Sequence, residues 1–240
     1  IDIDSSERLL ELSEKLIGYA DPLVGDPAAP ASQRAVVHLE LLTKVIDSFP
    51  NRTELPPKFF STSNAASLTD EEYWFNFLNI FVGGSDTTPY TAAAMTEFLM
   101  ASDAAAHRQL YVSNRAGYLS EVFRWTSTNA YVQRRLLADV EIDGTYIPAG
   151  SYVVLWNYSA NFDETYFSAT FAPGEESPVP HLAFGRGAHR CIGAQVSSME
   201  IAVYLDWYFD KMGSLGSGAT FTPLRSAFMR GYSSVRLELK

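Results

Sequence analysis

The single cysteine of the chain lies in a glycine-rich loop that spans Phe184 to Gly193. Gly185 and Gly187 precede Cys191, and glycine adopts backbone angles that other residues rarely reach, so the sequence predicts a tight loop. A helix is predicted to begin just after the cysteine, and the unpaired N–H groups of a helix start can donate hydrogen bonds to a thiolate. Such a setting lowers the pKa of a thiol, so the chemistry indicated for Cys191 is that of a thiolate. A buried structural cysteine beside a turn is the alternative.

A second group of reactive side chains, Asp86 and Thr87, lies in the middle of a long apolar helix predicted for residues 70–101. Gly84 and Pro89 flank the pair, and both residue types oppose helix formation in a helix interior. Because proline cannot donate to the carbonyl four residues earlier, the helix should open locally at this turn. An acid and a hydroxyl at an opened turn can transfer protons or hold water. The alternative is a packing kink in which Thr87 bonds back to its own helix.

Both segments resemble signature sequences of the cytochrome P450 superfamily. The cysteine loop matches the haem-ligand pattern Phe-x-x-Gly-x-(His/Arg)-x-Cys-x-Gly at every specified position, and His189, with His181 upstream, resembles the bacterial branch. The helix segment resembles the motif (Ala/Gly)-Gly-x-(Asp/Glu)-Thr-Thr. The resemblance implies the cofactor haem b (iron protoporphyrin IX). The residues expected to contact it are Cys191, His189, Arg134, Phe184, Gly84, Gly185 and Gly193.

The resemblance also implies a role for each reactive side chain. Cys191 is the expected axial ligand of the iron, and its thiolate donates electron density that favours O–O cleavage. Phe184 would shield the sulfur, and His189 would hold a haem propionate. Thr87 would stabilise bound dioxygen and organise water, while Asp86 would feed protons through water as a general acid.

A charged pair and an arginine extend the resemblance. Glu121 and Arg124 are three residues apart on a predicted helix and share one face, and they resemble the Glu-x-x-Arg helix that fixes the haem-side fold of the family. Taken alone, they would be an exposed salt bridge of little stabilising value. Arg134 begins a segment that resembles Arg-x-x-x-x-Asp-x-x-x-x-Gly, whose arginine binds a haem propionate. Arg135 is an adjacent competitor, and a solvated arginine on an edge strand is the alternative.

The substrate pocket implied by the resemblance includes Phe81, Val82, Thr128, Ala130 and Phe228. These side chains are apolar or small and polar, which favours a mainly apolar ligand that makes a few hydrogen bonds. Each of them is equally expected in ordinary core packing.

Hydrophobic periodicity and turn residues place these motifs on a mainly α-helical chain with small β-sheets. Thr69 and Glu72 form a capping box at the start of the long helix. Further helices are predicted over residues 5–19, 31–48, 103–111, 114–126 and 192–212, and strands between residues 131 and 157 and over 235–240. The resemblance implies the cytochrome P450 fold, incomplete in this chain. We divide it into a helical lead-in region over residues 1–67 and a haem-binding C-terminal portion over residues 68–240.

The composition limits the partners. The net charge of −10 leaves no basic excess to release counterions from nucleic acid, so no nucleic-acid partner is expected. A local basic docking face around Arg186 and Arg190 is compatible with that total. One cysteine cannot form an intramolecular disulfide, which fits a reducing compartment, and we expect a cytoplasmic protein. The longest apolar stretch, Trp74 to Val82, is far shorter than the roughly 18 residues that span a bilayer, so no membrane segment is expected.

Two features depart from the family pattern. Phe162 and Glu175 stand where arginines are common, and an arginine of the meander often ties that segment to the Glu-x-x-Arg pair, so the tie should be weaker or rebuilt here. The chain of 240 residues is also much shorter than family members, and it begins with Ile1 rather than methionine. We expect a fragment, or an N-terminal half that lies elsewhere or on a partner chain, and an apolar face left uncovered.

The function implied by the resemblance is that of a haem-thiolate monooxygenase. It would hydroxylate or epoxidise a small, mainly apolar organic substrate with electrons from a ferredoxin-type or flavoprotein donor. A second possibility keeps the haem but couples radicals or rearranges a natural product. A third is a haem-binding remnant without turnover. The substrate and the identity of the donor lie beyond the sequence pattern.

Overall fold

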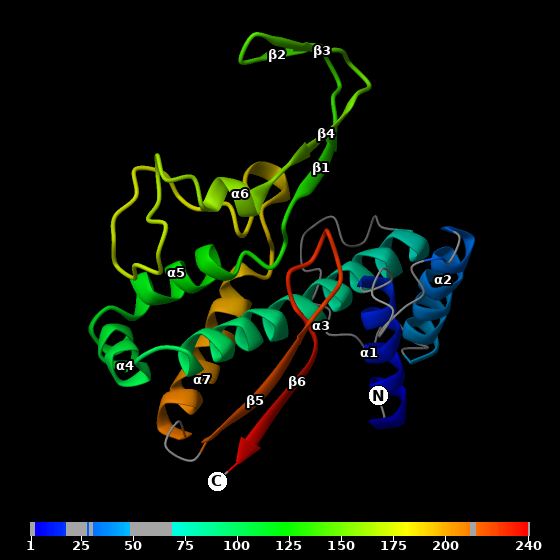
Figure 1. Cartoon of the computed structure of the whole chain (residues 1–240). Helices are drawn as coiled ribbons and strands as arrows, with labels where there is room; N and C mark the ends of the chain where they lie inside the picture. Colours follow the sequence, from blue (N-terminus) through cyan, green and yellow to red (C-terminus); the bar gives the residue numbers. More distant parts are fainter. Residues whose placement is uncertain (1–2, 18–27, 29–30, 49–68, 212–214, 240) are drawn as a thin grey trace. The chain divides into compact units, whose positions relative to one another are not determined.

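The structure, a computed structural model, describes residues 3–17, 28, 31–48, 69–211 and 215–239 (Figure 1). Helices dominate the described residues, and the predicted mainly α-helical fold class with small sheets is confirmed. The helices are α1 (Ile3–Ile17), α2 (Ala31–Ser48), α3 (Asp70–Met100), α4 (Ala104–Ser113), α5 (Arg115–Thr126), α6 (Asn157–Asn161) and α7 (Ala194–Lys211), and a 3-10 turn covers Gly187–His189.

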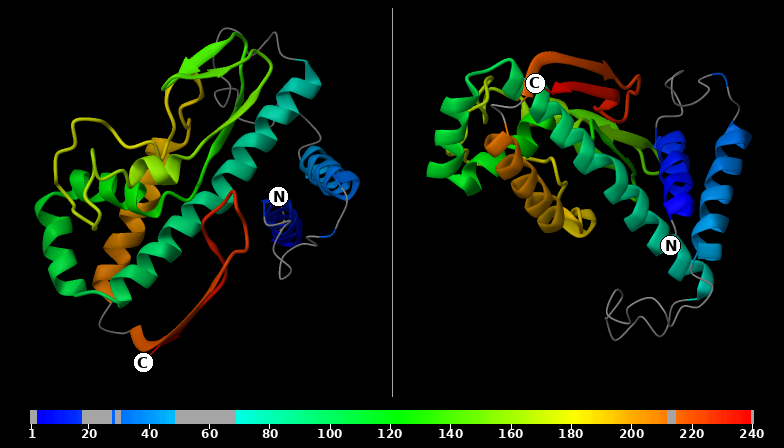
Figure 2. Two further views of the ribbon diagram at one scale, coloured as in Figure 1. Left: turned by 45° about the horizontal axis from the view of Figure 1, so that its top comes forward. Right: turned by 90° about the horizontal axis from the view of Figure 1, so that it is seen from below.

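Three two-stranded antiparallel sheets accompany the helices in the described part of the chain. The pairs are β1 (Val132–Arg135) with β4 (Tyr152–Leu155), β2 (Val140–Ile142) with β3 (Thr145–Ile147), and β5 (Leu215–Pro223) with β6 (Tyr232–Leu239). The turn between β2 and β3 has Asp143 and Gly144 at φ values of 48° and 72°, as a two-residue hairpin turn requires. Figure 2 shows β5 and β6 as a long ribbon. The sequence pattern does not predict β5, because its Gly-Ser-Gly segment has low strand propensity.

The chain forms two compact units. The first comprises Ile1–Pro89 and Leu224–Ser226, and the second comprises Tyr90–Pro223 and Ala227–Lys240. Helix α3 therefore contributes its first part to one unit and its last turns to the other. The functional division predicted at residue 68 stays a prediction.

In the first unit, α1, α2 and the start of α3 bury an apolar cluster made of Leu9, Leu12, Leu41, Tyr73, Trp74 and Leu78. The predicted capping box starts α3: the N–H of Thr69 donates to Glu72 Oε2 at 2.8 Å, and the N–H of Glu72 donates to Thr69 Oγ1 at 3.2 Å. The helix continues through Pro89 to Met100. It therefore positions the acid and the hydroxyl on one continuous element.

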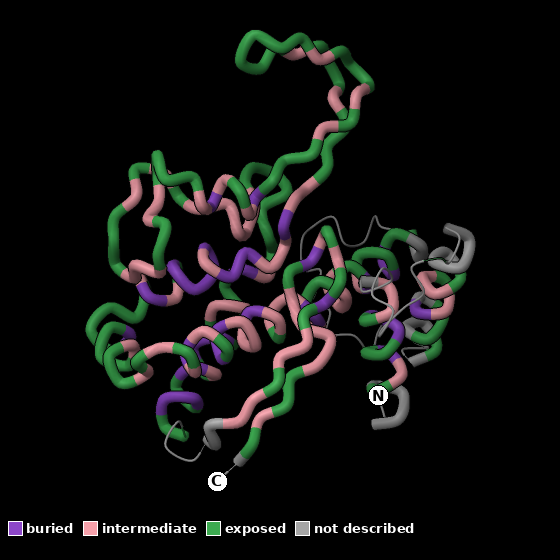
Figure 3. Tube along the Cα trace, in the orientation of Figure 1, coloured by how far each residue is buried: buried purple, intermediate pink, exposed green. Residues whose placement is uncertain are grey.

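In the second unit, the last turns of α3 pack with α4, α5 and α7 around a core of Met95, Leu99, Tyr111, Tyr118, Val122, Phe123, Ile201, Leu205, Tyr208 and Phe209. Figure 3 shows the buried residues as short segments along these helices. The apolar side chains on another side of α7 are exposed, namely Val196, Met199, Val203 and Trp207. These side chains give α7 an exposed apolar face, and its relation to the length of the chain stays a prediction. Among the described residues, no helix combines the length and the apolar character that crossing a membrane requires.

Candidate functional site

The loop before α7 presents Cys191 at the surface. Gly185 and Gly187 adopt the predicted left-handed backbone angles, with φ values of 65° and 69°. The backbone N–H of Cys191 donates to the carbonyl of Phe184 at 2.8 Å, which closes the loop. Because Cys191 is exposed, the alternative of a buried structural cysteine is wrong.

Gly193, two residues after Cys191, marks the start of α7 beside the sulfur. The carbonyl of Gly193 accepts the N–H of Ser197 at 2.9 Å, so Gly193 caps a helix whose first residue is Ala194. Cys191 therefore lies three residues before the helix, and the helix predicted to begin at residue 192 begins slightly later. A Cβ added to Gly193 would stand 3.8 Å from Cys191 Sγ, which places this glycine next to the sulfur.

The ring of Phe184 joins the cysteine loop to α5. Its centroid lies 4.6 Å from that of Phe123, at an interplanar angle of 49°, and Phe123 belongs to the buried core. His189 ends the 3-10 turn and is exposed. Phe184 thus contacts the core, whereas the His189 imidazole lies at the surface. The predicted roles of Phe184 and His189 at the haem stay predictions.

The Glu121 and Arg124 side chains form a buried, two-point ion pair on α5. Arg124 Nε donates to Glu121 Oε2 at 2.7 Å, and Arg124 Nη2 donates to Glu121 Oε1 at 2.6 Å. The Arg124 side chain is only 4% exposed and the Glu121 side chain 10%, so the alternative of an exposed salt bridge is wrong. Paired donors and acceptors of this planar geometry are the strong form of the interaction.

The same pair holds the segment that follows α6. Arg124 Nη1 donates to the carbonyl of Asn161 at 2.6 Å, Arg124 Nη2 to that of Thr170 at 3.1 Å, and Glu121 Oε1 accepts the N–H of Ala172 at 2.8 Å. Phe162, which stands where an arginine is common, places its ring centroid 5.1 Å from the guanidinium carbon. The tie to the meander, which we expected to be weaker or rebuilt because Glu175 stands where an arginine is common, is rebuilt here from the backbone groups of Thr170 and Ala172.

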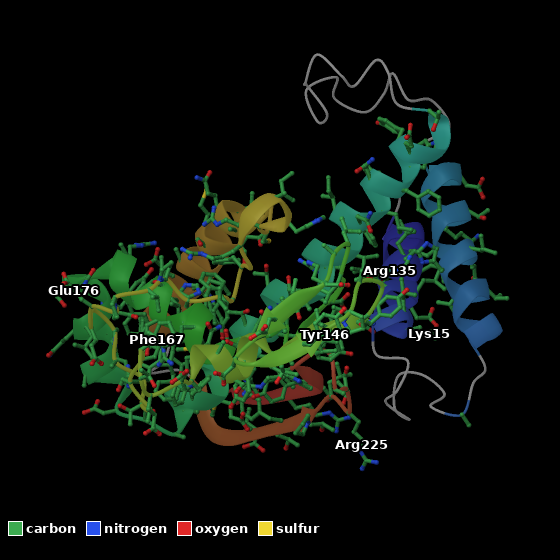
Figure 4. The ribbon with its side chains drawn as sticks, turned by 90° about the horizontal axis from the view of Figure 1, so that it is seen from above. Lys15, Arg135, Tyr146, Phe167, Glu176 and Arg225 are labelled. Carbon is green, nitrogen blue, oxygen red and sulfur yellow. The ribbon has the colours of Figure 1, made fainter. Side chains whose placement is uncertain are left out.

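A second ring, that of Phe167, lies 5.6 Å from the guanidinium carbon of Arg124. Figure 4 labels Phe167 and Glu176 in the segment that follows α6. Phe167 is partly buried and Glu176 is exposed. Two aromatic rings of this segment therefore lie beside the guanidinium group of Arg124.

Strand β1 places Arg134 and Arg135 on opposite faces, because consecutive strand residues alternate. Arg134 pairs in register with Val153, and its Nη1 donates to the carbonyl of Gln133 at 2.9 Å. Arg135, labelled in Figure 4, has Nη2 within 3.9 Å of the place that a Cβ on Gly150 would occupy. A ligand on one face can thus meet only one of the two arginines, and the propionate assignment to Arg134 stays a prediction.

Asp86 is buried in the first unit and is 4% exposed. Its Oδ2 accepts a hydrogen bond from Ser13 Oγ of α1 at 2.9 Å. Burial raises the pKa of Asp86 to about 6, the Ser13 hydrogen bond opposes that rise, and the negative charge of Glu14 adds to it. The carboxyl is therefore poised to gain or release a proton slightly below neutral pH.

Thr87 bonds back to its own helix. Its Oγ1 donates to the carbonyl of Gly83 at 2.7 Å, and Ser85 Oγ donates likewise to the carbonyl of Phe81 at 2.6 Å. This is the arrangement that the packing-kink alternative describes, and the catalytic role of Thr87 stays a prediction. A Cβ added to Gly84 would meet no described atom within 4 Å, so the helix surface there is open.

The comparisons with known proteins converge on one family. The Cytochrome P450 family model matches residues 117–211. A Steroid C26-monooxygenase of Mycobacterium tuberculosis (strain CDC 1551 / Oshkosh) is 34% identical over 173 residues, which are 70% of this chain and 46% of that protein. Another protein of that name, from strain ATCC 25618 / H37Rv, is 33% identical over 236 residues, 93% of this chain and 52% of that protein. The chain belongs to the cytochrome P450 family.

Solved structures show the same fold for this P450 chain. Mycobacterium marinum cytochrome P450 CYP268A2 in complex with pseudoionone has a TM-score of 0.84 at 22% identity, over 99% of this chain and 59% of that one. CYP109E1 from Bacillus megaterium in complex with corticosterone has a TM-score of 0.77 at 21% identity, over 98% of this chain and 66% of that one. The chain spans about half the length of the curated relatives it matches.

The cysteine loop of this P450 chain fits the haem that its family implies. The loop offers one thiolate, the axial ligand type of haem-thiolate proteins, at an exposed position. A Cβ on Gly187 would meet no described atom within 4 Å, so a flat group can approach the backbone there. Ile192 is 88% exposed and gives the same surface an apolar character.

Three of the five predicted pocket residues of the P450 lie together in the second unit. The N–H of Ala130 donates to the carbonyl of Phe228 at 2.9 Å, and the N–H of Arg230 donates to the carbonyl of Thr128 at 2.7 Å. Between them, Asn129 Oδ1 is buried and has no hydrogen-bond partner among the described residues. The other two predicted pocket residues, Phe81 and Val82, are partly buried against the core of the first unit.

The sequence gives little sign of one polar residue of this site, Asn161. Its side chain is 0% exposed and makes hydrogen bonds to Leu182, just before the cysteine loop, and to Ser127, which caps α5. The only available signal is that it precedes Phe162 and Asp163 in a segment with a family counterpart. That signal does not specify contacts with residues far away in the chain.

Proposed function

We propose that this P450 chain supplies the haem-binding and proton-delivering residues of a monooxygenase. The observation that carries the proposal is the exposed position of Cys191 in a closed, glycine-rich loop. The backbone N–H of Cys191 donates to the Phe184 carbonyl at 2.8 Å. The proposed reaction is hydroxylation or epoxidation of a small, mainly apolar organic substrate, with electrons from a separate redox protein. Haem b, when bound, supplies the oxygen-activating and electron-transfer chemistry.

The side chains of the second unit would hold the cofactor. Cys191 is proposed to ligate the iron through its sulfur, with Phe184 beside it and Gly185 and Gly193 in contact with the macrocycle. His189 and Arg134 are exposed and are proposed to bind the propionates, since imidazole and guanidinium groups donate to carboxylates. The buried Glu121–Arg124 pair holds the surrounding backbone and does not take part in the chemistry.

Asp86 and Thr87 are proposed to manage protons. A general acid works best when its pKa lies near the working pH, and burial brings the pKa of Asp86 to about 6. Near neutral pH its carboxyl can take up a proton and release it again. The Thr87 hydroxyl would exchange its bond to the Gly83 carbonyl for one to a water, and so pass that proton on. Gly84 is proposed to contact the cofactor, a role supported by the absence of any described side chain within 4 Å of a Cβ added there.

The substrate proposal follows the names of the relatives. Curated relatives are Steroid C26-monooxygenases, so we propose a steroid as the first class of substrate to test. Phe81, Val82, Thr128, Ala130 and Phe228 would line its pocket. The buried Asn129 Oδ1 would accept a hydrogen bond from a substrate hydroxyl.

The electron donor is proposed to be a ferredoxin-type protein or a flavoprotein. Arg186 and Arg190 are exposed in the cysteine loop. They would attract an acidic donor to the face nearest the thiolate, although the chain as a whole has a net charge of −10.

Turnover of steroids by the haem-loaded, full-length protein with a ferredoxin, its reductase and NAD(P)H tests the proposal. We expect NAD(P)H consumption to yield hydroxylated steroid, and Thr87→Ala to keep consuming NAD(P)H while product falls and peroxide accumulates. A protein that binds haem yet consumes no reductant with ferredoxin or flavoprotein donors would contradict the monooxygenase and indicate a haem-binding remnant. Unchanged coupling in Thr87→Ala would remove that residue from the proton path.

A further inference from the structure

Asn161, the last residue of α6, is fully buried and uses both polar ends of its side chain. Its Nδ2 donates to Ser127 Oγ at 2.8 Å, and its Oδ1 accepts the N–H of Leu182 at 2.6 Å. Ser127 caps α5, and Leu182 lies just before the cysteine loop. One side chain therefore connects the end of α5 to the start of the loop that holds the thiolate.

The chemistry of the two partners requires an amide at this position. The Ser127 hydroxyl already donates to the carbonyl of Arg124 at 2.6 Å, so its oxygen can only accept a further hydrogen bond. The N–H of Leu182 can only donate. A side chain that donates on one side and accepts on the other meets both needs, whereas a carboxylate would face the Ser127 oxygen with a second acceptor.

The hydrogen bonds continue from Leu182 to the cysteine. The carbonyl of Leu182 accepts the N–H of Gly185 at 2.9 Å, and the carbonyl of Phe184 accepts the N–H of Cys191 at 2.8 Å. Asn161 thus binds the segment from Leu182 to Phe184, and the Phe184 carbonyl of that segment holds the N–H of Cys191. The backbone carbonyl of Asn161 also accepts Arg124 Nη1 at 2.6 Å, so the buried ion pair of α5 reaches the loop through the same residue.

We propose that Asn161 is a positioning residue that sets the place of the Cys191 thiolate by binding the N–H of Leu182, an inference that rests on the proposed haem-thiolate function. The core contact of Phe184 holds the loop from its apolar side, and Asn161 holds it from its polar side. Loss of the Asn161 amide would leave the partly buried N–H of Leu182 without its side-chain acceptor. The loop would then sample arrangements in which the sulfur is displaced.

Four variants of the haem-loaded protein separate this role from general damage. Asn161→Ala removes both side-chain bonds, Asn161→Asp keeps an acceptor for Leu182, and Ser127→Ala removes only the Ser127 contact. Asn157→Ala is the matched control, because Asn157 is a buried asparagine of the same helix that forms no hydrogen bond with the described residues of the cysteine loop. The readouts are the thiolate-type Soret band of the reduced carbon-monoxide complex and the amide hydrogen exchange of Leu182 and Cys191.

In Asn161→Ala, we expect the ratio of thiolate-ligated to thiolate-free complex to fall about tenfold. Exchange at both amides should rise by a similar factor, because a partly buried N–H donor loses its acceptor. Asn161→Asp and Ser127→Ala should retain most of the band, and Asn157→Ala should match the wild type. Wild-type band ratio and exchange in folded Asn161→Ala would overturn the proposal, as would equal losses in Asn157→Ala. If Asn161→Ala does not fold, the proposal is overturned when Asn161→Asp and Ser127→Ala, which both keep the acceptor for Leu182, lose the Soret band. A wild-type protein without the band refutes the proposed function, while the exchange rates still test the contact.

Discussion

Ser13 Oγ on α1 donates a hydrogen bond to Asp86 Oδ2 on α3 at 2.9 Å, and both side chains are buried. A carboxylate with a hydroxyl donor is stabilised in its charged form, whereas burial and Glu14 favour the neutral form. The resulting pKa of about 6 is a balance of these effects. The proposed proton donor of α3 is therefore tuned by a residue that no motif of the family sequence indicates.

Ser13→Ala should raise the pKa of Asp86 further above about 6, because the hydrogen bond that opposes burial is lost. The pH at which product yield per NAD(P)H changes should move upward in this variant. The pH profile of coupling measures the shift. Ser85→Ala is the matched control, since Ser85 precedes Asp86 but bonds only to the Phe81 carbonyl of its own helix in the hydrogen bonds described above. A profile that moves equally in both variants would show that Ser13 has no specific effect.

Asp86→Asn should improve stability while it impairs proton delivery. The pKa of Asp86 is raised in the folded chain from 3.8 to about 6, so its contribution to stability is complete below pH 3.8 and is lost as pH rises through about 6. The amide of the Asp86→Asn variant does not ionise, so the variant does not lose this stability as the pH rises. We expect the unfolding free energy of Asp86→Asn to exceed that of the wild type by about 1 kcal/mol above pH 6, with the difference vanishing below pH 4. Denaturant unfolding at both pH values checks this, and a difference that does not change with pH would contradict it.

Arg124→Lys should destabilise the second unit by about 1.5 to 3 kcal/mol, because lysine keeps the charge but cannot reproduce the two-point contact with Glu121. Urea unfolding measures the change. Arg115→Lys on the same helix is the control, since the Arg115–Asp206 pair at 2.7 Å is half exposed and should contribute at most about 1 kcal/mol. Similar losses in the two variants would mean that burial of the Glu121–Arg124 pair has no special weight.

Phe162→Leu should cost about 0.5 to 2 kcal/mol through loss of the ring beside the Arg124 guanidinium, at 5.1 Å in the structure. Phe162→Tyr keeps an aromatic face and should remain close to the wild type. Thermal unfolding of the two variants distinguishes a cation–π contribution from simple apolar packing. Equal stability of the leucine and tyrosine variants would reduce Phe162 to a packing residue.

The sequence predicts what depends on local signals. The Thr69–Glu72 capping box, the Asp143–Gly144 turn and the positive φ of Gly185 follow from a few neighbouring residues. The existence of the helices follows from hydrophobic periodicity. Helix ends are less sharply determined, and α7 begins at Ala194 rather than at residue 192 because Gly193 serves as its cap.

Contacts between distant residues lie beyond such signals. The partners of Arg124 include the carbonyls of Asn161 and Thr170, which any residue type could provide, so no sequence pattern identifies them. Ser13 and Asp86 are separated by 73 residues, and a serine in an amphipathic helix has no distinctive spacing. Strand β5 exists through its pairing with β6 and not through its own propensity.

The central claim is that Cys191 ligates haem iron as a thiolate, and the spectrum of the reduced carbon-monoxide complex tests it most directly. The haem-loaded, full-length protein should show the strongly red-shifted Soret band of thiolate ligation, and Cys191→His should abolish it while haem remains bound. Absence of the band in intact, haem-loaded wild-type protein, or its persistence in Cys191→His, would contradict the account.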